Sequence, residues 1–205
     1  MASLTRRGGA PTAKREAIEA AVLEAAEMLL AEGASFAELS VERIATRAGI
    51  SRTAFYFYFR DKRELLMRLT EGVSDVLYAA AEGWWSGEGD GSADLDRVLR
   101  EILAIYRDHA ALLRAVVETS AYDEPVAEFW RALIGRFVLA TRQRLEAEQK
   151  QGRAARLPAG ETAFALVWMT ERTCYQQLVQ GGDVDDEALA AAITGIWRRT
   201  VYGES

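Results

Sequence analysis

The feature that most constrains this chain is the spacing of its apolar residues, which recur every three to four positions along most of its length. Ile18, Val22, Ala25 and Leu29 stand at i, i+4, i+7 and i+11, which is one face of an amphipathic helix from about Ala13 to Glu32. We find no convincing apolar/polar alternation of period two and no hairpin dipeptide between apolar runs. The pattern predicts an all-α fold of about nine helices.

The remaining helices are expected where the same periodicity lies between capping residues and glycines. Asp61 and Glu64 form a D-x-x-E capping box, which predicts the start of a long helix. The glycine-rich stretch Gly83 to Ser92 is expected to be a loop. The apolar stripe of the long helix is Leu66, Leu69, Val73, Val76 and Ala80, and further helices are expected over about 41–48, 51–56, 95–109, 112–117, 126–145, 163–180 and 185–202.

Composition favours a soluble protein that works inside the cell. Half of the 205 residues are hydrophobic and 27% are charged, which is typical of a globular chain with a sizeable core. The N-terminal residues contain no apolar stretch of the signal-peptide kind, and no apolar run approaches the roughly 20 residues that span a bilayer. Cys174 is the only cysteine and can form no intrachain disulfide. We therefore expect a cytoplasmic location and no membrane partner.

The charge is distributed unevenly between the two parts of the chain. The net charge is −6, yet residues 1–63 contain 10 Lys/Arg against 8 Asp/Glu, and the remainder contains 15 against 23. A locally basic N-terminal surface is a weak hint of a nucleic-acid partner, because a two-charge excess is also ordinary for a solvated face.

The most informative stretch is 39–66, LSVERIATRAGISRTAFYFYFRDKRELL. Ser40 can cap one short helix, Gly49-Ile50 can turn the chain, and Ser51 can cap a second short helix. Two short helices joined by a tight glycine-containing turn are the helix-turn-helix layout, in which the second helix enters the major groove of DNA. The motif predicts binding to double-stranded DNA.

The side chains of this stretch fit that role. Arg52 can donate two hydrogen bonds to guanine, and Thr53 can contact a base edge or a thymine methyl. Tyrosine, lysine and serine side chains here can donate to phosphate, as can the helix N-terminus behind Ser40. The candidate DNA-binding residues are Ser40, Ser51, Arg52, Thr53, Tyr56, Phe57, Tyr58 and Lys62.

Five consecutive aromatic residues, 55–59, follow the second helix. One short helix cannot bury all five rings, because they point all round its axis. Phe55 and Phe59 are expected in the small domain's own core, whereas the three rings between them include exposed ones and predict a contact surface.

The run AGISRTAFYFYFRDKRELL (48–66) resembles the signature of TetR-family transcriptional regulators. The segments MTERT (169–173) and IW…VYGE (196–204) extend the resemblance toward the ethionamide-resistance-repressor branch of that family. The resemblance implies a three-helix DNA-binding domain over 1–63, with 1–12 as a flexible arm, and a ligand-binding and dimerisation domain over 64–205. It also implies a repressor that a small hydrophobic effector releases from its operator. Ala54 departs from the family, because many members have a hydroxyl-bearing residue there.

The resemblance places an apolar ligand pocket in the C-terminal domain, with Val167 and Thr170 where the related repressor has amides. Thr141 and Thr170 are polar residues on otherwise apolar faces, a combination that suits ligand sites in helical bundles. An aromatic stripe can equally be plain core. The candidate ligand-binding residues are Ile102, Tyr106, Trp130, Ile134, Phe137, Thr141, Val167, Thr170, Tyr175 and Trp197.

The family also dimerises through its last two long helices, which here are 163–180 and 185–202. These helices present more apolar surface than one bundle face requires, so we expect a homodimer. The apolar residues expected to form its four-helix interface are Val167, Trp168, Leu178, Ile193 and Trp197.

Other chemically suggestive patterns have structural interpretations. The alternating glycines at 87–91 follow no strand and therefore predict no dinucleotide site, and the acids at 183–187 are expected to cap a helix instead of binding a metal. Cys174 is expected to be a buried thiol, and the lone His109 cannot complete a catalytic triad or a metal site. We expect no enzyme activity, no cofactor and no metal.

Two alternatives remain open from the sequence. One is a DNA-binding protein without a ligand, whose aromatic residues are all core. The other is a small-molecule-binding or enzymatic helical bundle in which the N-terminal motif plays no part. A salt-dependent shift of DNA separates the second from the rest, and loss of that shift on adding a hydrophobic compound separates the first.

Overall fold

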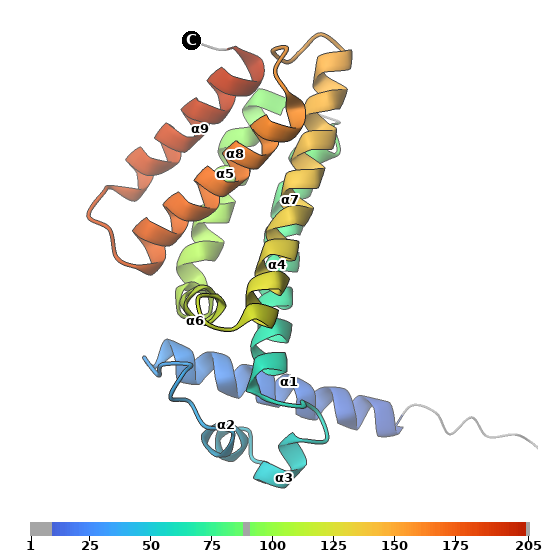
Figure 1. Ribbon diagram of the computed structural model, residues 1–205, viewed down its shortest axis with the longest axis vertical. Helices are drawn as coiled ribbons and strands as arrows, with labels where there is room; N and C mark the ends of the chain where they lie inside the picture. Colours follow the sequence, from blue (N-terminus) through green and yellow to red (C-terminus); the bar gives the residue numbers. More distant parts are fainter. Residues whose placement is uncertain (1–9, 88–90, 204–205) are drawn as a thin grey trace, which may run out of the picture. The chain divides into compact units, whose positions relative to one another are not determined.

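The computed structural model describes residues 10–87 and 91–203, and across these residues the chain contains nine α-helices, one short π-helix and no strand (Figure 1). The all-α prediction is confirmed. The chain divides into two compact units, Met1–Leu69 and Thr70–Ser205. The division lies inside one helix, α4 (Lys62–Trp85), and the boundary after residue 63 that the sequence suggested falls in the same helix.

The first unit contains α1 (Ala10–Ala31), α2 (Val41–Arg47), α3 (Arg52–Phe55) and the beginning of α4. Helix α2 packs against both α1 and α3 (Figure 1). The predicted face of α1 is the buried one, since Val22, Ala25 and Leu29 are in the core and Ile18 is half-buried. The core of the unit is completed by buried apolar residues from the other elements, among them Ile44, Ala45, Phe55, Phe59, Leu65 and Leu66.

Helix α4 begins at the acidic pair that the sequence identified. The Asp61 carboxylate accepts a hydrogen bond from the Glu64 backbone N–H at 2.8 Å, as an N-cap residue does. The Glu64 carboxylate accepts from the backbone N–H of Arg60 at 2.8 Å and from the Arg60 guanidinium at 3.1 Å. It therefore reaches one residue further back than in a capping box, and these bonds lower the pKa of Glu64.

The second unit is a bundle in which α6 is seen nearly end-on, across the direction of its neighbours (Figure 1). Helix α7 packs against α6 and α8, and α5 packs against α9. No helix in the described part of the chain is long and apolar enough to cross a membrane. The elements of this unit after α4 are α5 (Gly91–Asp108), α6 (Ala110–Ser120), α7 (Glu124–Lys150), α8 (Ala159–Cys174), the π-helix η1 (Tyr175–Val179) and α9 (Asp186–Tyr202).

Three expectations for this unit were wrong in detail. The stretch 83–92 is not a loop throughout, because α4 continues to Trp85 and α5 already begins at Gly91. Val76 is 51% exposed, and Leu77 is buried in its place. The expected helix 163–180 changes after Cys174 into the π-helix η1, whose wider turn shifts the register of the side chains that follow.

The interior of this unit contains an ion pair on α7. Glu148 is 1% exposed and accepts from Arg144 at 2.7 Å and from Arg153 at 2.8 Å. Arg144 is 5% exposed, and its guanidinium lies over the ring of Trp84, 5.8 Å from the centroid. Two residues earlier on the same helix, Arg142 and Glu146 form an exposed ion pair, also at 2.7 Å.

Candidate nucleic-acid interface and apolar pocket

The turn between α2 and α3 is built by Gly49. Its φ of +70° lies in the left-handed region, which residues with a Cβ rarely adopt. The N–H of Gly49 donates to the carbonyl of Thr46 at 3.1 Å, and the N–H of Ile50 donates to that of Ala45 at 3.0 Å. This pair of bonds is the Schellman arrangement that ends a helix, so the glycine sets where α2 stops and where α3 can start.

Serine hydroxyls begin both helices of the motif. The Ser40 hydroxyl accepts from the Arg43 backbone N–H at 3.2 Å, and the Ser51 hydroxyl accepts from the Ala54 backbone N–H at 3.1 Å. The predicted capping roles are confirmed. Each hydroxyl keeps its own hydrogen, so both serines can still donate to a phosphate.

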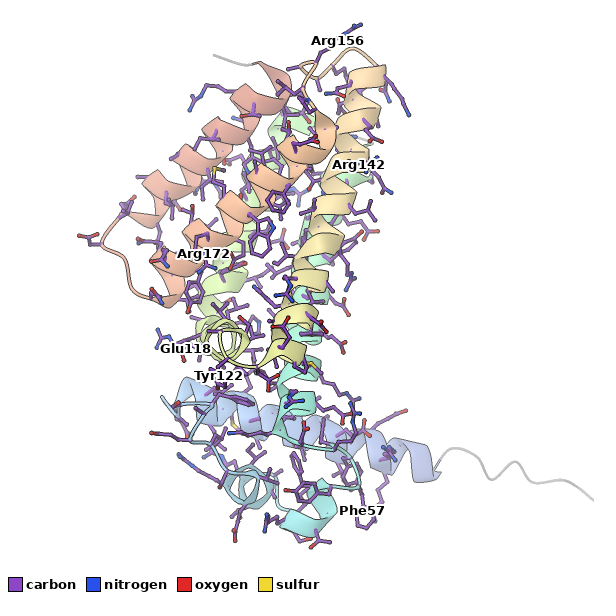
Figure 2. The ribbon with its side chains drawn as sticks, viewed as in Figure 1. Phe57, Glu118, Tyr122, Arg142, Arg156 and Arg172 are labelled. Carbon is purple, nitrogen blue, oxygen red and sulfur yellow. The ribbon has the colours of Figure 1, made fainter. Side chains whose placement is uncertain are left out.

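The aromatic run divides between core and surface as expected. Phe55 and Phe59 are 0% and 1% exposed, and their ring centroids are 5.4 Å apart. Tyr56 is 47% exposed and Phe57 is 74% exposed, and Figure 2 shows Phe57 at the outside of the segment that follows α3. The core pair therefore holds α3 in place while α3 presents polar residues to solvent, since Arg52, Thr53 and Tyr56 are all exposed.

Two of the candidate phosphate-contacting residues are already engaged within the unit. The Tyr58 ring is half-buried, with the Arg15 guanidinium 5.6 Å from its centroid. The Lys62 ammonium donates to the backbone carbonyls of Phe36, Ala37 and Leu39 at 2.8, 2.8 and 3.3 Å. An ammonium has three hydrogens, so these bonds use all of them. Lys62 thus closes the segment between α1 and α2, a role that differs from the predicted phosphate contact.

The second unit contains an apolar cavity of about 80 Å³, measured as the space open to the centre of a water-sized molecule. Helices α4, α5, α6, α7, α8 and α9 all contribute to its walls. Nine of the ten predicted ligand-binding residues line it. The exception is Tyr175, which is buried beside Arg172 and accepts a hydrogen bond from Gln180 at 3.4 Å. The nine are Ile102, Tyr106, Trp130, Ile134, Phe137, Thr141, Val167, Thr170 and Trp197.

The contribution of α4 to this cavity was not predicted from the sequence. Trp84 and Trp85 were assigned to a loop, yet both line the cavity from the last turn of α4. The Trp84 ring meets Trp197 edge-on at 5.6 Å, and the Trp85 ring meets Phe137 at 5.7 Å. The continuation of the apolar period through Gly83 was the signal that could have placed them. The other residues missed are Thr70, Ser74, Leu77, Ala81, Leu95, Val98, Leu99, Leu113, Leu133 and Glu171.

Two threonines of the cavity wall are bound to wall indoles. The Thr170 hydroxyl donates to the Leu166 carbonyl at 2.9 Å and accepts from the Trp197 indole N–H at 2.9 Å. The Thr141 hydroxyl accepts from the Trp85 indole N–H at 3.3 Å. Both threonines line the cavity as predicted, but their hydrogen bonds hold the aromatic walls in position.

Two further polar residues line the cavity without such partners. Ser74 and Glu171 are each 4% exposed, and neither the serine hydroxyl nor the glutamate oxygens form a hydrogen bond with the described part of the chain. Burial raises the pKa of Glu171, and the charge of the neighbouring Arg172 offsets only part of this increase. Cys174 is buried, as predicted, and burial raises the pKa of its thiol to about 12.

The residues expected at a dimer interface are not all on the surface. Ile193 and Trp197 are 2% and 5% exposed within their own unit, and Val167 lines the cavity. The expectations for Ile193 and Trp197 were wrong as contacts between chains, because the inward face of α9 packs against its own bundle, whereas the half-buried Val167 stays a prediction. The apolar side chains that do face outward on α8 and α9 include Phe164 and Ile196.

The acidic cluster before α9 is a helix cap, as expected. The Asp185 carboxylate accepts from the Ala188 backbone N–H at 2.8 Å, and Asp186 is paired with Arg107. Across 10–87 and 91–203, no group of three His, Cys, Asp or Glu side chains is arranged to hold a metal ion.

Comparison with known proteins agrees with this geometry at both ends of the chain. Residues 22–69 match the family model described as bacterial regulatory proteins, tetR family, and residues 95–203 match the model of the C-terminal domain of the transcriptional regulator EthR. The HTH-type transcriptional regulator EthR of Mycolicibacterium smegmatis is 35% identical over 191 residues, covering 90% of this chain and 86% of the relative. The EthR of Mycobacterium tuberculosis is 32% identical over 193 residues, covering 91% and 88%.

Solved structures share the fold. A TetR-family regulator from Syntrophomonas wolfei superposes with a TM-score of 0.73 at 15% identity, covering 92% of this chain and 95% of that one. A transcriptional regulator from Saccharomonospora viridis, solved in complex with choline, has a TM-score of 0.73 at 15% identity, covering 93% and 98%. The chain therefore belongs to the tetR family of bacterial regulatory proteins, with a C-terminal domain of the EthR type, and is a DNA-binding transcriptional regulator.

Proposed function

We propose that this regulator is a cytoplasmic repressor that binds operator DNA through the first unit and leaves it when a small hydrophobic effector enters the cavity of the second. The observation that carries the DNA-binding part is the exposed row on and after α3, because Arg52, Thr53 and Tyr56 are held outward by the buried Phe55. Arg52 is the base-reading residue of this proposal, since a guanidinium matches the paired acceptors of guanine. Ser40, Ser51, Tyr56, Phe57 and Tyr58 complete the proposed surface.

Replacing Arg52 with alanine should cost about 1–3 kcal/mol of operator affinity and relax the preference at one base pair. The measurement is a binding titration with an operator selected from a random DNA pool, together with its single-base variants. The matched control is Arg142→Ala, which removes the same charge from an exposed site on α7 in the other unit. Unchanged base preference in the Arg52 variant would show that another side chain reads the operator.

The cavity supports the effector part of the proposal. It is enclosed by aromatic and aliphatic side chains from six helices, as small-molecule sites in bundles are. At about 80 Å³ it is smaller than an engineered cavity of roughly 150 Å³ that binds benzene, so a larger effector has to separate the helices. Helix α4 lines the cavity, and its first residues belong to the first unit. An effector that displaces α4 would therefore also move residues of the DNA-binding unit. The effector must prefer the displaced state, because equal affinity for both states shifts nothing.

Replacing Ala81 with leucine should fill the cavity, raise the melting temperature and abolish the response to effectors while operator binding persists. Ala81 lines the cavity at 3% exposure, and filling a void contributes about 0.5–2 kcal/mol. Apolar compounds that stabilise the wild type in thermal melts are then tested for release of the operator. Val76→Leu, exposed on the same helix, is the control. A filled variant that still releases DNA with compound would favour the alternative in which the aromatic residues are only core.

The proposal also includes a homodimer, because two recognition helices must meet major-groove turns about 34–36 Å apart. The outward apolar residues of α8 and α9 are the proposed contacts, in particular Phe164 at 58% and Ile196 at 39% exposure, with the half-buried Trp168 beside Phe164.

Changing either Phe164 or Ile196 to glutamate should weaken the dimer by about 2 kcal/mol or more, which is about thirtyfold in dissociation constant. Sedimentation at micromolar concentration measures it. Leu139→Glu, on an exposed apolar position of α7, should leave the dimer intact. A wild type that sediments as a monomer with and without DNA would contradict this part of the proposal.

A further inference from the structure

Glu171 is the most unusual residue of the cavity. It is 4% exposed, it lines an otherwise apolar chamber, and both of its carboxylate oxygens lack a hydrogen bond to any described residue. The other cavity-lining polar group in this condition is the hydroxyl of Ser74. Leaving a buried carboxyl unpartnered is costly, and buried polar groups in proteins are as a rule satisfied. Two such groups in one cavity point to an occupant that satisfies them.

No Lys, Arg or His side chain stands among the described residues that line the cavity. The nearest cationic group is Arg172, whose Nε is 3.6 Å from a Glu171 oxygen, beyond hydrogen-bonding distance. Arg172 is exposed, and its guanidinium lies over the ring of Tyr175, which does not line the cavity. The acid therefore faces the chamber without a donor of its own.

The walls around this acid are suited to a cation. The cavity is lined by the rings of Tyr106, Phe137 and four tryptophans, and the faces of such rings attract positive charge. Three of the wall indoles, those of Trp84, Trp85 and Trp197, already donate their N–H groups to Tyr202, Thr141 and Thr170. An occupant can therefore use only the π-faces of these indoles, and the Arg144 guanidinium already lies over the ring of Trp84.

We propose that the effector is a lipophilic amine, whose apolar body packs among the aromatic rings while its protonated nitrogen donates to the Glu171 carboxylate, with Ser74 as a second acceptor. This inference rests on the proposed role of the cavity as the effector site. A hydrogen bond between two charged groups in an apolar chamber discriminates strongly against a neutral molecule of the same shape.

The ionisation of Glu171 makes the preference depend on pH. Burial raises the pKa of Glu171, so the empty chamber keeps the acid neutral to a higher pH than water would. An ammonium binds best to the carboxylate, so the preference for an amine over a neutral analogue should grow as pH rises through that pKa. Tyr106 from α5 also faces the cavity, but burial raises its pKa well above its usual value, as it does for Cys174 on α8, and both stay neutral over this range. The cationic group beside the carboxylate is Arg172 on α8, at 3.6 Å.

The test compares octylamine with octan-1-ol, two probes of the same length that differ in the charged head group. Calorimetric titration of the full chain at pH 7.5 should show the amine binding at least about tenfold tighter than the alcohol. In Glu171→Gln the affinity for octylamine should fall about tenfold, and the affinity for octanol should stay within about twofold. Thr194→Val is the control, because the Thr194 hydroxyl is also buried and unpartnered but lies outside the cavity lining.

A second measurement needs no variant. The ratio of amine to alcohol affinity in the wild type should increase between pH 5 and pH 8, over which an aliphatic amine stays protonated. If octanol binds and octylamine binds no more tightly, the preference for an amine is wrong, but the cavity can still be the effector site. If neither probe binds, the effector site itself is misassigned and the inference falls with it.

Discussion

Replacing Glu148 with glutamine should lower the free energy of unfolding by about 3–5 kcal/mol at neutral pH, because it leaves a buried guanidinium without its counterion. Glu148 is 1% exposed, and Arg144, its partner at 2.7 Å, is 5% exposed. The Arg144 Nε already lacks a hydrogen-bond partner among the described residues, so the carboxylate is its main compensation. Urea unfolding followed by circular dichroism measures the loss.

The matched control lies on the same helix. Arg142 and Glu146 have the same spacing and the same 2.7 Å separation, but their side chains are 52% and 39% exposed. Glu146→Gln should leave the free energy of unfolding close to that of the wild type, because solvent screens an exposed pair and the charge stays hydrated. Equal losses in the two variants would show that burial is not what makes the Glu148 pair matter.

The Arg144–Glu148 pair should also make the stability of the fold depend on pH in a defined direction. Hydrogen bonds from Arg153, together with the charges of Arg144 and Arg153, lower the pKa of Glu148 despite its burial. A carboxyl whose pKa is lower in the folded state stabilises the fold above its unfolded pKa, and that contribution is lost as pH falls through the folded pKa. The stability difference between wild type and Glu148→Gln should therefore be full at pH 7 and shrink below about pH 4.5.

Lys62→Met should destabilise the first unit by about 2–3 kcal/mol, since three backbone carbonyls lose a charged donor together. The methionine keeps the aliphatic stem against Phe36, over whose ring the ammonium lies at 5.0 Å from the centroid. Unfolding of this unit, followed by hydrogen exchange of residues 36–39 and the start of α4, locates the loss.

Lys14→Met is the control for Lys62, because it removes the same charge from an exposed position on α1. Its stability should stay within about 0.5 kcal/mol of the wild type. If Lys62 instead contacts DNA phosphate, its variant would keep full stability and lower the salt dependence of binding by about one charge. The two roles are thus separated by measurements on one protein.

Most of the fold could be predicted from the sequence because its signals are local. The period of the apolar residues places α1, and serine caps with Gly49 place α2 and α3 within a residue or two. The end of α4 could not be placed in this way. Glycine and serine around the two tryptophans suggest a loop, but burial of Trp84 against Trp197 outweighs the weak helix propensity of Gly83.

The candidate site was predictable only in part, for a related reason. The aromatic walls of the cavity could be anticipated, since they follow a pattern or a resemblance. The hydrogen-bond partners of the polar side chains could not be anticipated, because they depend on which residues distant in the sequence lie close together in the fold. Lys62 is satisfied by carbonyls some 23–26 residues away, whereas Glu171 is satisfied by none of the described residues. The sequence next to Lys62 or Glu171 therefore does not predict whether either side chain finds a hydrogen-bond partner.

The arrangement of the cavity walls has a practical consequence for anyone who works with this protein. Four of its five tryptophans (Trp84, Trp85, Trp130 and Trp197) line the cavity, and the fifth, Trp168, does not. Intrinsic fluorescence at the indole wavelength therefore comes mostly from the chamber in which an effector is proposed to bind. An occupant would quench or shift that emission directly, so the molecule contains its own optical reporter of occupancy and can be screened without a label, a DNA fragment or a known operator.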